Sequence, residues 1–330
     1  MDRVISIALD LSVPSEQLSE MIAGCICACS EHEDIKLILL GNEELIKKEL
    51  SAYGPLQNRI DVIGVSGNIS ESDALVTAVR DKQDSALVKG LKLVRNGGAG
   101  AFLSCLAPKL INDAAQMIIG RIERINISPM TTLVPGLTKP FLVFDSGYMG
   151  VKLRPSDFVL FSLMGSLYMR HLSSEQCPVV RLLSDSPIPE NGGTLYRDAY
   201  ELLKRTRETE FEGTIRPAEL LNGKADVVVC DGFAGSLILN MISGMISNLS
   251  SGATVKRRHL FGKPKEPEME AILSTIDISS RGITFFPCLQ HTAIALCENP
   301  GRETVQRAVG FAKRLVKEDI RARLISQLRL

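Results

Sequence analysis

The sequence predicts an α/β protein in which helices cover a mainly parallel sheet. Short runs rich in β-branched and aromatic residues alternate with longer segments of helical periodicity, which is the pattern of βαβ units. The chain has 330 residues, of which 45% are apolar, enough to bury a large core as one unit or as two lobes. Basic and acidic residues both number 38, so no net charge attracts nucleic acid, and we expect no nucleic-acid partner.

The predicted strands are short apolar runs that end in polar or turn residues. In chain order they cover residues 4–10, 35–41, 59–65, 99–105, 140–146, 178–185, 225–231, 283–289 and 292–297. Parallel strands that are buried on both faces have nearly continuous apolar sequences, as these runs do. The sheet is therefore expected to be rich in parallel pairs.

The covering helices are predicted by amphipathic segments between these runs. They include residues 15–32, 42–53, 85–98 and 198–209 and, as one or two helices, residues 301–330. Residues 250–270 differ, because they are polar, basic and proline-bearing, and they predict an exposed basic loop or arm.

Features of the whole chain predict a cytoplasmic protein. The N-terminus carries Asp2 and lacks the basic and apolar blocks of a signal peptide. No uninterrupted apolar run approaches the roughly 18 residues of a spanning helix. Eight cysteines are sparse for a disulfide scaffold, and several lie in apolar runs, where a reduced thiol packs as a small hydrophobe.

An Asp-Gly pair at residues 231–232 separates a predicted strand from a predicted helix. In parallel sheets, ligands bind beyond the carboxyl ends of strands, where the next helix presents free N–H groups and the positive end of its dipole. Gly232 and Gly235 allow a tight turn with close backbone approach, and Ser236 is expected to cap the helix over residues 237–249. We interpret the broad apolar face of that helix as buried or as a dimer interface.

The segment ADVVVCDGFAGS, residues 225–236, resembles the hallmark of the PlsX family, the bacterial acyl-carrier-protein:phosphate acyltransferases of phospholipid synthesis. Other segments occur in the family's order, at residues 79–104, 144–150, 161–170, 198–204 and 292–296. The resemblance spans nearly the whole chain. It implies a single three-layer α/β/α unit with a parallel-rich sheet, related in fold to phosphotransacetylases and isopropylmalate dehydrogenases.

The resemblance also implies a reaction and its partners. A fatty acyl group moves from the thioester of acyl carrier protein to inorganic phosphate, which yields an acyl phosphate. A homodimer is implied, with no metal and no organic cofactor, and some family members associate peripherally with the membrane. Such a site needs backbone donors and cations for phosphate, and further donors for the developing oxyanion.

Several glycine-rich loops of the family are changed in this chain. Asp10 alone remains of an Asp-x-Met-Gly-Gly-Asp loop, and the next loop keeps Ser104 but loses its Gly-Asn-Thr-Gly core, where Pro108 removes a backbone donor. Residues 213–217 keep only the first glycine of a further loop, and Leu296 replaces a family histidine. Two hypotheses follow: an acyltransferase with an altered site, or a catalytically impaired relative that acts as a binding or regulatory partner.

The candidate residues lie near the ends of predicted strands. Lys82 and Asp231 are the catalytic candidates. The candidates for binding phosphate or substrate are Arg80, Lys82, Ser85, Ser104, Lys109, Asp145, Gly147, Gly232, Gly235 and Ser236. Structural alternatives stay open, because residues 80–85 also fit a capped helix start with solvated bases, Lys109 fits a helix surface, and Asp231 fits a turn that satisfies its own amides.

The cysteines offer one further chemical hypothesis. Cys105 stands at a predicted strand end, where a helix N-terminus that lowered its pKa would make it an acyl-accepting nucleophile. A buried inert thiol is the favoured interpretation. The run from Cys25 to Cys29 lacks C-x-x-C spacing and lies in a helical pattern, so we assign it to the core or an interface and not to a metal site.

Overall fold

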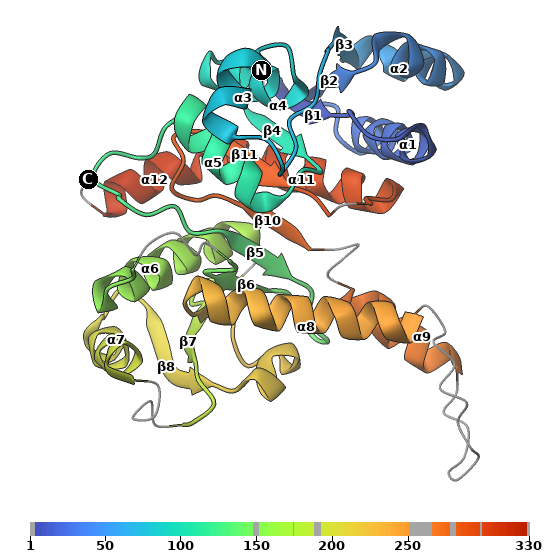
Figure 1. Cartoon of the computed structure of the whole chain (residues 1–330). Coiled ribbons are helices and arrows are strands. Elements are labelled where there is room, and N and C mark those ends of the chain that lie inside the picture. The colour runs from blue at the N-terminus through green and yellow to red at the C-terminus, as the bar shows by residue number, and fades with distance from the viewer. Residues whose placement is uncertain are drawn as a thin grey trace. The chain divides into compact units, whose positions relative to one another are not determined.

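A computed structural model describes residues 4–147, 152–173, 175–187, 193–250, 266–277, 282–297 and 299–328. The chain divides into two compact units (Figure 1). Unit 1 comprises Met1–Met130 and Ile283–Leu330, and unit 2 comprises Thr131–Gly282.

Unit 1 is built on parallel strands that follow the order β3-β2-β1-β4-β11, with β10 antiparallel to β11. Its strands are β1 (Ile5–Asp10), β2 (Ile35–Gly41), β3 (Ile60–Gly64), β4 (Ala101–Ser104), β10 (Ile283–Phe285) and β11 (Thr292–Ala295). Its helical elements are α1 (Ser15–Glu31), α2 (Glu43–Leu50), η1 (Ser51–Arg59), α3 (Leu75–Asp81), α4 (Ala86–Arg95), α5 (Pro108–Ile118), α11 (Arg302–Lys317) and α12 (Ile320–Gln327). Helix α1 packs against α11, and α4 packs against α5.

Unit 2 has a second set of parallel strands in the order β6-β9-β7-β8, with β5 antiparallel to β6. Its strands are β5 (Thr131–Val134), β6 (Phe141–Phe144), β7 (Val179–Leu183), β8 (Glu210–Ile215) and β9 (Val227–Val229). Its helical elements are α6 (Pro155–Leu172), α7 (Gly193–Arg205), η3 (Pro217–Asn222), α8 (Gly232–Ser250) and α9 (Glu266–Ile276).

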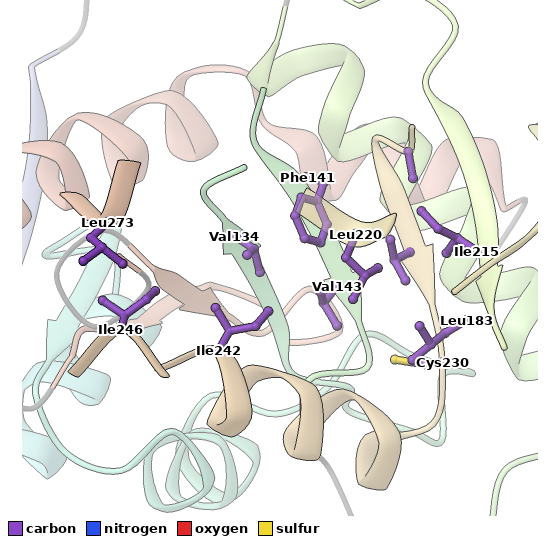
Figure 2. Packing of buried hydrophobic residues seen from close by; sticks show 12 residues of the cluster. Val134, Phe141, Val143, Leu183, Ile215, Leu220, Cys230, Ile242, Ile246 and Leu273 are labelled. Atoms are coloured by element: carbon purple, nitrogen blue, oxygen red, sulfur yellow. The ribbon is translucent and has the colours of Figure 1, made fainter. Parts of the chain in front are cut away.

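Alternation along β6 gives unit 2 a helix layer on each face of its strands. Phe144 points to one face, where its ring lies 5.6 Å from that of Phe161 in α6. Phe141 and Val143 point to the other face and join an apolar cluster that includes Ile242 of α8 (Figure 2). Successive strand residues face opposite sides of a sheet, so both of its faces are buried in unit 2.

The predicted α/β fold with a parallel-rich sheet is confirmed, and every predicted strand is present. Two strands, β5 and β8, were not predicted. Residues 213–215 belong to β8, so the segment interpreted as part of a changed loop is a strand that continues into η3. Its sequence, EFEGTI, hides the strand because β8 is an edge strand with two exposed glutamates and a glycine.

The predicted basic arm at residues 250–270 falls mainly outside the described residues. Ser250 is the last residue of α8, and α9 begins at Glu266, so both ends of the segment are helical. The C-terminal segment forms two helices, α11 and α12, and residues 15–31 form α1 as predicted. Cys25 and Cys29 are buried in α1, in agreement with the core interpretation.

Helix α8 has two apolar faces. Ile242 and Ile246 are buried in the unit 2 cluster, where Leu273 of α9 joins them (Figure 2). A second row is exposed and comprises Phe233, Leu237, Met241, Met245 and Leu249, each between 54% and 62% accessible. By length and composition α8 would suit a membrane span, with 22% of its residues buried. These properties alone do not separate a span from a surface helix, and the buried isoleucines attach α8 to the core of unit 2.

Candidate functional site

A pocket of about 600 Å³ lies in unit 2, where three helices begin. Its lining residues are Lys152, Leu153, Arg154, Pro155, Thr194, Leu195, Asp198, Asp231, Gly232 and Phe233. These residues come from the starts of α6, α7 and α8, which follow the parallel strands β6, β7 and β9. The pocket therefore lies beyond the carboxyl ends of parallel strands, the usual position of ligands in open α/β sheets.

The first turn of α6 is closed by a side chain of its own. Pro155 is the first helical residue, a position where its missing N–H costs nothing. The buried carboxylate of Asp157 accepts a hydrogen bond from the backbone N–H of Arg154 at 2.7 Å. It also pairs with the Arg154 guanidinium at 3.3 Å. An internal acid thus already occupies the positive end of this helix.

The first turn of α8 is closed by the residue that precedes it, Asp231. Its Oδ1 accepts hydrogen bonds from the N–H groups of Phe233 and Ala234, both at 2.9 Å. The helix begins at Gly232, so Asp231, and not Ser236, caps it. The prediction for Ser236 is wrong because this residue lies inside the helix, where its hydroxyl accepts a hydrogen bond from Asn240. Asp231 therefore hydrogen-bonds the amides of its own turn, as in the structural alternative given for it above.

Tyr196 of α7 holds the other oxygen of Asp231. The phenol donates to Asp231 Oδ2 at 2.6 Å, and the backbone N–H of Asp231 donates to the phenol oxygen at 3.1 Å. The ring packs edge-on against Phe158, with 5.4 Å between centroids. Burial, followed by the neighbouring Cys230 and Asp231, raises the pKa of Tyr196. The phenol therefore stays protonated and fixes the carboxylate of Asp231 at the pocket wall.

Asp145 and Gly235 lie side by side behind this wall. A Cβ atom on Gly235 would overlap the carbonyl oxygen of Asp145, so only glycine lets α8 begin this close to the end of β6. Cys230 Sγ donates to the same carbonyl oxygen at 3.2 Å. Asp145 is buried, and its Oδ1 accepts from the N–H of Gly147 at 3.0 Å. Of the candidates in unit 2, only Asp231 and Gly232 line the pocket.

In unit 1, pairing of β1 with β4 brings two candidates together. Ser104 Oγ donates to the buried Asp10 carboxylate at 2.8 Å, and the N–H of Ser12 donates to its other oxygen at 2.9 Å. Burial raises the pKa of Asp10 more than these hydrogen bonds lower it. A carboxyl group and a hydroxyl therefore meet at the carboxyl ends of two parallel strands, the position of a site in this unit too.

Cys105 follows this pair directly. Burial, the charge of Asp10 and the neighbouring Cys297 raise the pKa of its thiol. A raised pKa is the opposite of what an activated nucleophile needs, so it favours the interpretation of Cys105 as an inert thiol. The changed loop after it leads into α5, whose first residue is Pro108.

The remaining basic candidates of unit 1 have acidic partners. Lys82 Nζ lies 2.9 Å from the carboxylate of Asp73 and lowers its pKa through this hydrogen bond. Arg80 pairs with Asp81 at 2.8 Å and is largely exposed. Ser85 is buried and caps α4, where its hydroxyl accepts from the N–H of Val88. Ser85 is therefore a helix cap and Arg80 a solvated base, whereas Lys82 is held by Asp73.

Lys109 is a surface residue of α5. It pairs with Asp113 one helical turn later at 2.5 Å, and 72% of its side chain is exposed. This matches the alternative of a helix-surface charge. Among the described residues, no three His, Cys, Asp or Glu side chains gather closely enough to hold a metal ion.

Sequence reasoning did not identify Lys152, Arg154 or Tyr196. The first two had an indirect signal, since Pro155 after a predicted strand marks the start of a helix, and the residues just before it lie at that start. Tyr196 carried none, because its partner Asp231 is 35 residues away in the sequence and only folding brings them together.

Comparisons with known proteins agree with this architecture. Residues 5–323 match a family model described as "Fatty acid synthesis protein". A "Phosphate acyltransferase" of Clostridium botulinum (strain Loch Maree / Type A3) is 36% identical over 231 residues, which are 70% of this chain and 68% of the relative. A protein of the same name from Clostridium tetani (strain Massachusetts / E88) is 34% identical over 230 residues, with the same coverage.

Two solved structures share the fold at low sequence identity. The EutD phosphotransacetylase from Staphylococcus aureus gives a TM-score of 0.59 at 14% identity and covers 94% of both chains. A phosphotransacetylase from Streptococcus pyogenes gives 0.59 at 13% identity, covering 95% of this chain and 94% of its own. The likeness to phosphotransacetylases that the sequence implied is therefore confirmed for the fold.

Proposed function

The chain belongs to the PlsX family of fatty acid synthesis proteins, and on this premise we propose that it is a phosphate acyltransferase that transfers a fatty acyl group from acyl carrier protein to inorganic phosphate. The observation that carries the proposal is the sequence identity of 36% and 34% between this chain and two proteins named for this activity, over more than two thirds of each chain. We propose that the enzyme acts in the cytoplasm, where acyl carrier protein and phosphate are available.

The proposed reaction is a single acyl transfer. A phosphate oxygen attacks the thioester carbonyl carbon, the C–O bond of the acyl phosphate forms, and the C–S bond breaks. The sulfur leaves as the thiolate of the carrier arm and takes up a proton. Catalysis requires groups that hold phosphate and stabilise the oxyanion, and no nucleophilic side chain. The high pKa of Cys105 is compatible with this scheme.

We propose that Lys82 is the cation that holds phosphate, in exchange for its pairing with Asp73. Phosphate carries more charge than a carboxylate and can displace it from the ammonium group. Lys82 also donates to the carbonyl of Asn68 at 2.7 Å, so it fixes the loop before α3. These two roles predict different behaviour when Asp73 is changed.

The test is acyl-phosphate formation by the purified protein with acyl carrier protein and phosphate, using Lys82→Ala and Asp73→Ala. If Lys82 binds phosphate, Lys82→Ala lowers kcat/KM for phosphate. Asp73→Ala frees the ammonium group of Lys82 and should leave kcat/KM for phosphate unchanged or raise it. Equal losses in both variants would assign Lys82 a structural role only. Lys36→Ala, which breaks the exposed pair with Asp61 on β2 and β3, is the matched control.

A folded protein that makes no acyl phosphate at any chain length would contradict the proposed enzyme. If that protein still bound acyl carrier protein, the family member would act as a binding or regulatory partner. Binding to immobilised acyl carrier protein therefore accompanies the turnover assay and separates the two functions.

We propose further that the exposed face of α8 joins two copies of the chain. Its four large side chains from Leu237 to Leu249 lie one turn apart, and Ile272 of α9 is 46% exposed. A row of this size on a surface helix is typical of an interface. Met245→Glu should convert a dimer to a monomer in light scattering, whereas Val76→Glu on α3, a still more exposed apolar position, should not. If Met245→Glu instead lost binding to lipid vesicles while the mass from light scattering stayed the same, the face would be assigned to peripheral membrane contact.

A further inference from the structure

We infer that the pocket at the starts of α6, α7 and α8 binds the fatty acyl chain of the substrate, the hydrocarbon that an acyl thioester and an acyl phosphate share. The inference deepens the proposed function and rests on it. It assigns to this pocket the hydrocarbon, and not the phosphate, of the reaction.

Three helices supply hydrocarbon to the pocket. Leu153 and Pro155 stand at the start of α6, Leu195 in the first turn of α7, and Phe233 in the first turn of α8. Phe233 is 62% exposed, so its ring offers a surface that the protein itself leaves uncovered. The volume of about 600 Å³ falls within the roughly 300–1,000 Å³ of small-molecule sites. Apolar walls of this kind gain most from a ligand that removes them from water.

Two of the three helix N-termini at the pocket, those of α6 and α8, are poorly suited to phosphate. Asp157 accepts a hydrogen bond from the N–H of Arg154, the residue before α6, and Asp231 accepts from the N–H groups of Phe233 and Ala234 in the first turn of α8. Tyr196 fixes the second oxygen of Asp231. A phosphate at either helix would meet a carboxylate already in place and would be repelled by it. A methylene chain needs no donor and meets no such opposition, so the same geometry that disfavours an anion admits hydrocarbon.

One cation lines the pocket without an acidic partner. Lys152 makes no ion pair within the described part of the chain, whereas Arg154 is paired with Asp157. A long ammonium side chain beside apolar walls suits a ligand with a hydrocarbon body and one polar or anionic end. A fatty acyl group attached to a thioester or to phosphate has this form.

Direct binding tests the inference without any turnover. Displacement of a fluorescent fatty acid from the full chain is measured with saturated fatty acids of roughly 8, 12 and 16 carbons, and affinity should rise about fourfold for each methylene that enters the pocket, the equivalent of about 0.8 kcal/mol. Phe233→Ala and Leu195→Ala should weaken the longest acid by about tenfold and the shortest one much less. Phe233→Leu should restore most of the loss.

Leu202→Ala is the matched control, because Leu202 is an exposed leucine of the same helix as Leu195 that does not line the pocket. Unchanged binding of long acids by both pocket variants would overturn the inference, whether or not acyl phosphate is formed. A fatty acid that carries a photoreactive diazirine should label residues 152–155 or 193–198. Label confined to residues 237–249 would also overturn it, because the chain would then lie on the exposed face of α8.

The outcomes separate this inference from the proposed function. If affinity rises with chain length in the wild-type protein but not in Phe233→Ala, and the protein makes no acyl phosphate, the result supports the acyl pocket and contradicts the enzyme. If the protein makes acyl phosphate and the dependence of affinity on chain length is the same in all variants, the result supports the enzyme and overturns the pocket assignment. With acyl carrier protein as donor, the pocket also predicts that Phe233→Ala raises KM for long acyl chains more than for short ones.

Discussion

Replacement of two glycines of α8 by alanine should change stability in opposite directions. At Gly235 a new methyl group would overlap the backbone carbonyl of Asp145, which cannot rotate away as a side chain would. Moving the start of α8 or the end of β6 typically costs about 1–3 kcal/mol, and more where backbone meets backbone. At Gly244 no atom lies within 4 Å of the new methyl group, so alanine should stabilise the helix by about 0.5–1 kcal/mol.

The assay is urea unfolding followed by far-UV circular dichroism, with each transition fitted separately because two compact units can unfold in separate steps. Only the transition of unit 2 should move, and it should move to lower urea for Gly235→Ala and to higher urea for Gly244→Ala. The chemistry of the change and the helix are the same in both variants, so the difference isolates the contact with Asp145. Equal shifts in both variants would refute the close-packing role of Gly235.

Three further predictions concern titratable groups. Tyr196→Phe should cost about 1.5–3 kcal/mol near pH 7 by removing the hydrogen bond to Asp231. Since the pKa of Tyr196 is raised in the folded protein, its contribution to the free energy of unfolding is complete below about pH 10 and declines above it. Denaturation measured at several pH values should show this decline in the wild-type protein and not in the variant. Asp10→Asn should stabilise unit 1 at pH 7, with the gain vanishing below about pH 4, because the raised pKa makes the ionised form costly; no gain in thermal unfolding would contradict this. Iodoacetamide should modify the exposed Cys177 well before Cys105, as mass spectrometry would show, and the reverse order would contradict the raised thiol pKa.

The local pattern of the sequence determined the strands and most helices of this protein. The run at residues 225–231 is apolar up to an acid and a glycine, and it forms β9 followed by the capped start of α8. Such features depend on neighbours in the chain, as does the cap of α4 by Ser85. Strand β8 is an exception, because its glycine and charged residues weaken the pattern and it was not predicted. The resemblance to a family rested on these same segments.

The tertiary structure alone decided which groups have partners. Leu237 and Ile242 are both apolar residues of α8, yet one is 54% exposed and the other buried, because only one face of the helix meets β6 and α9. Tyr196 reaches Asp231 because α7 and α8 both begin where parallel strands end. The sequence shows whether a residue is apolar or ionisable. Its burial, its pKa and its accessibility to substrate depend on which groups the fold places next to it.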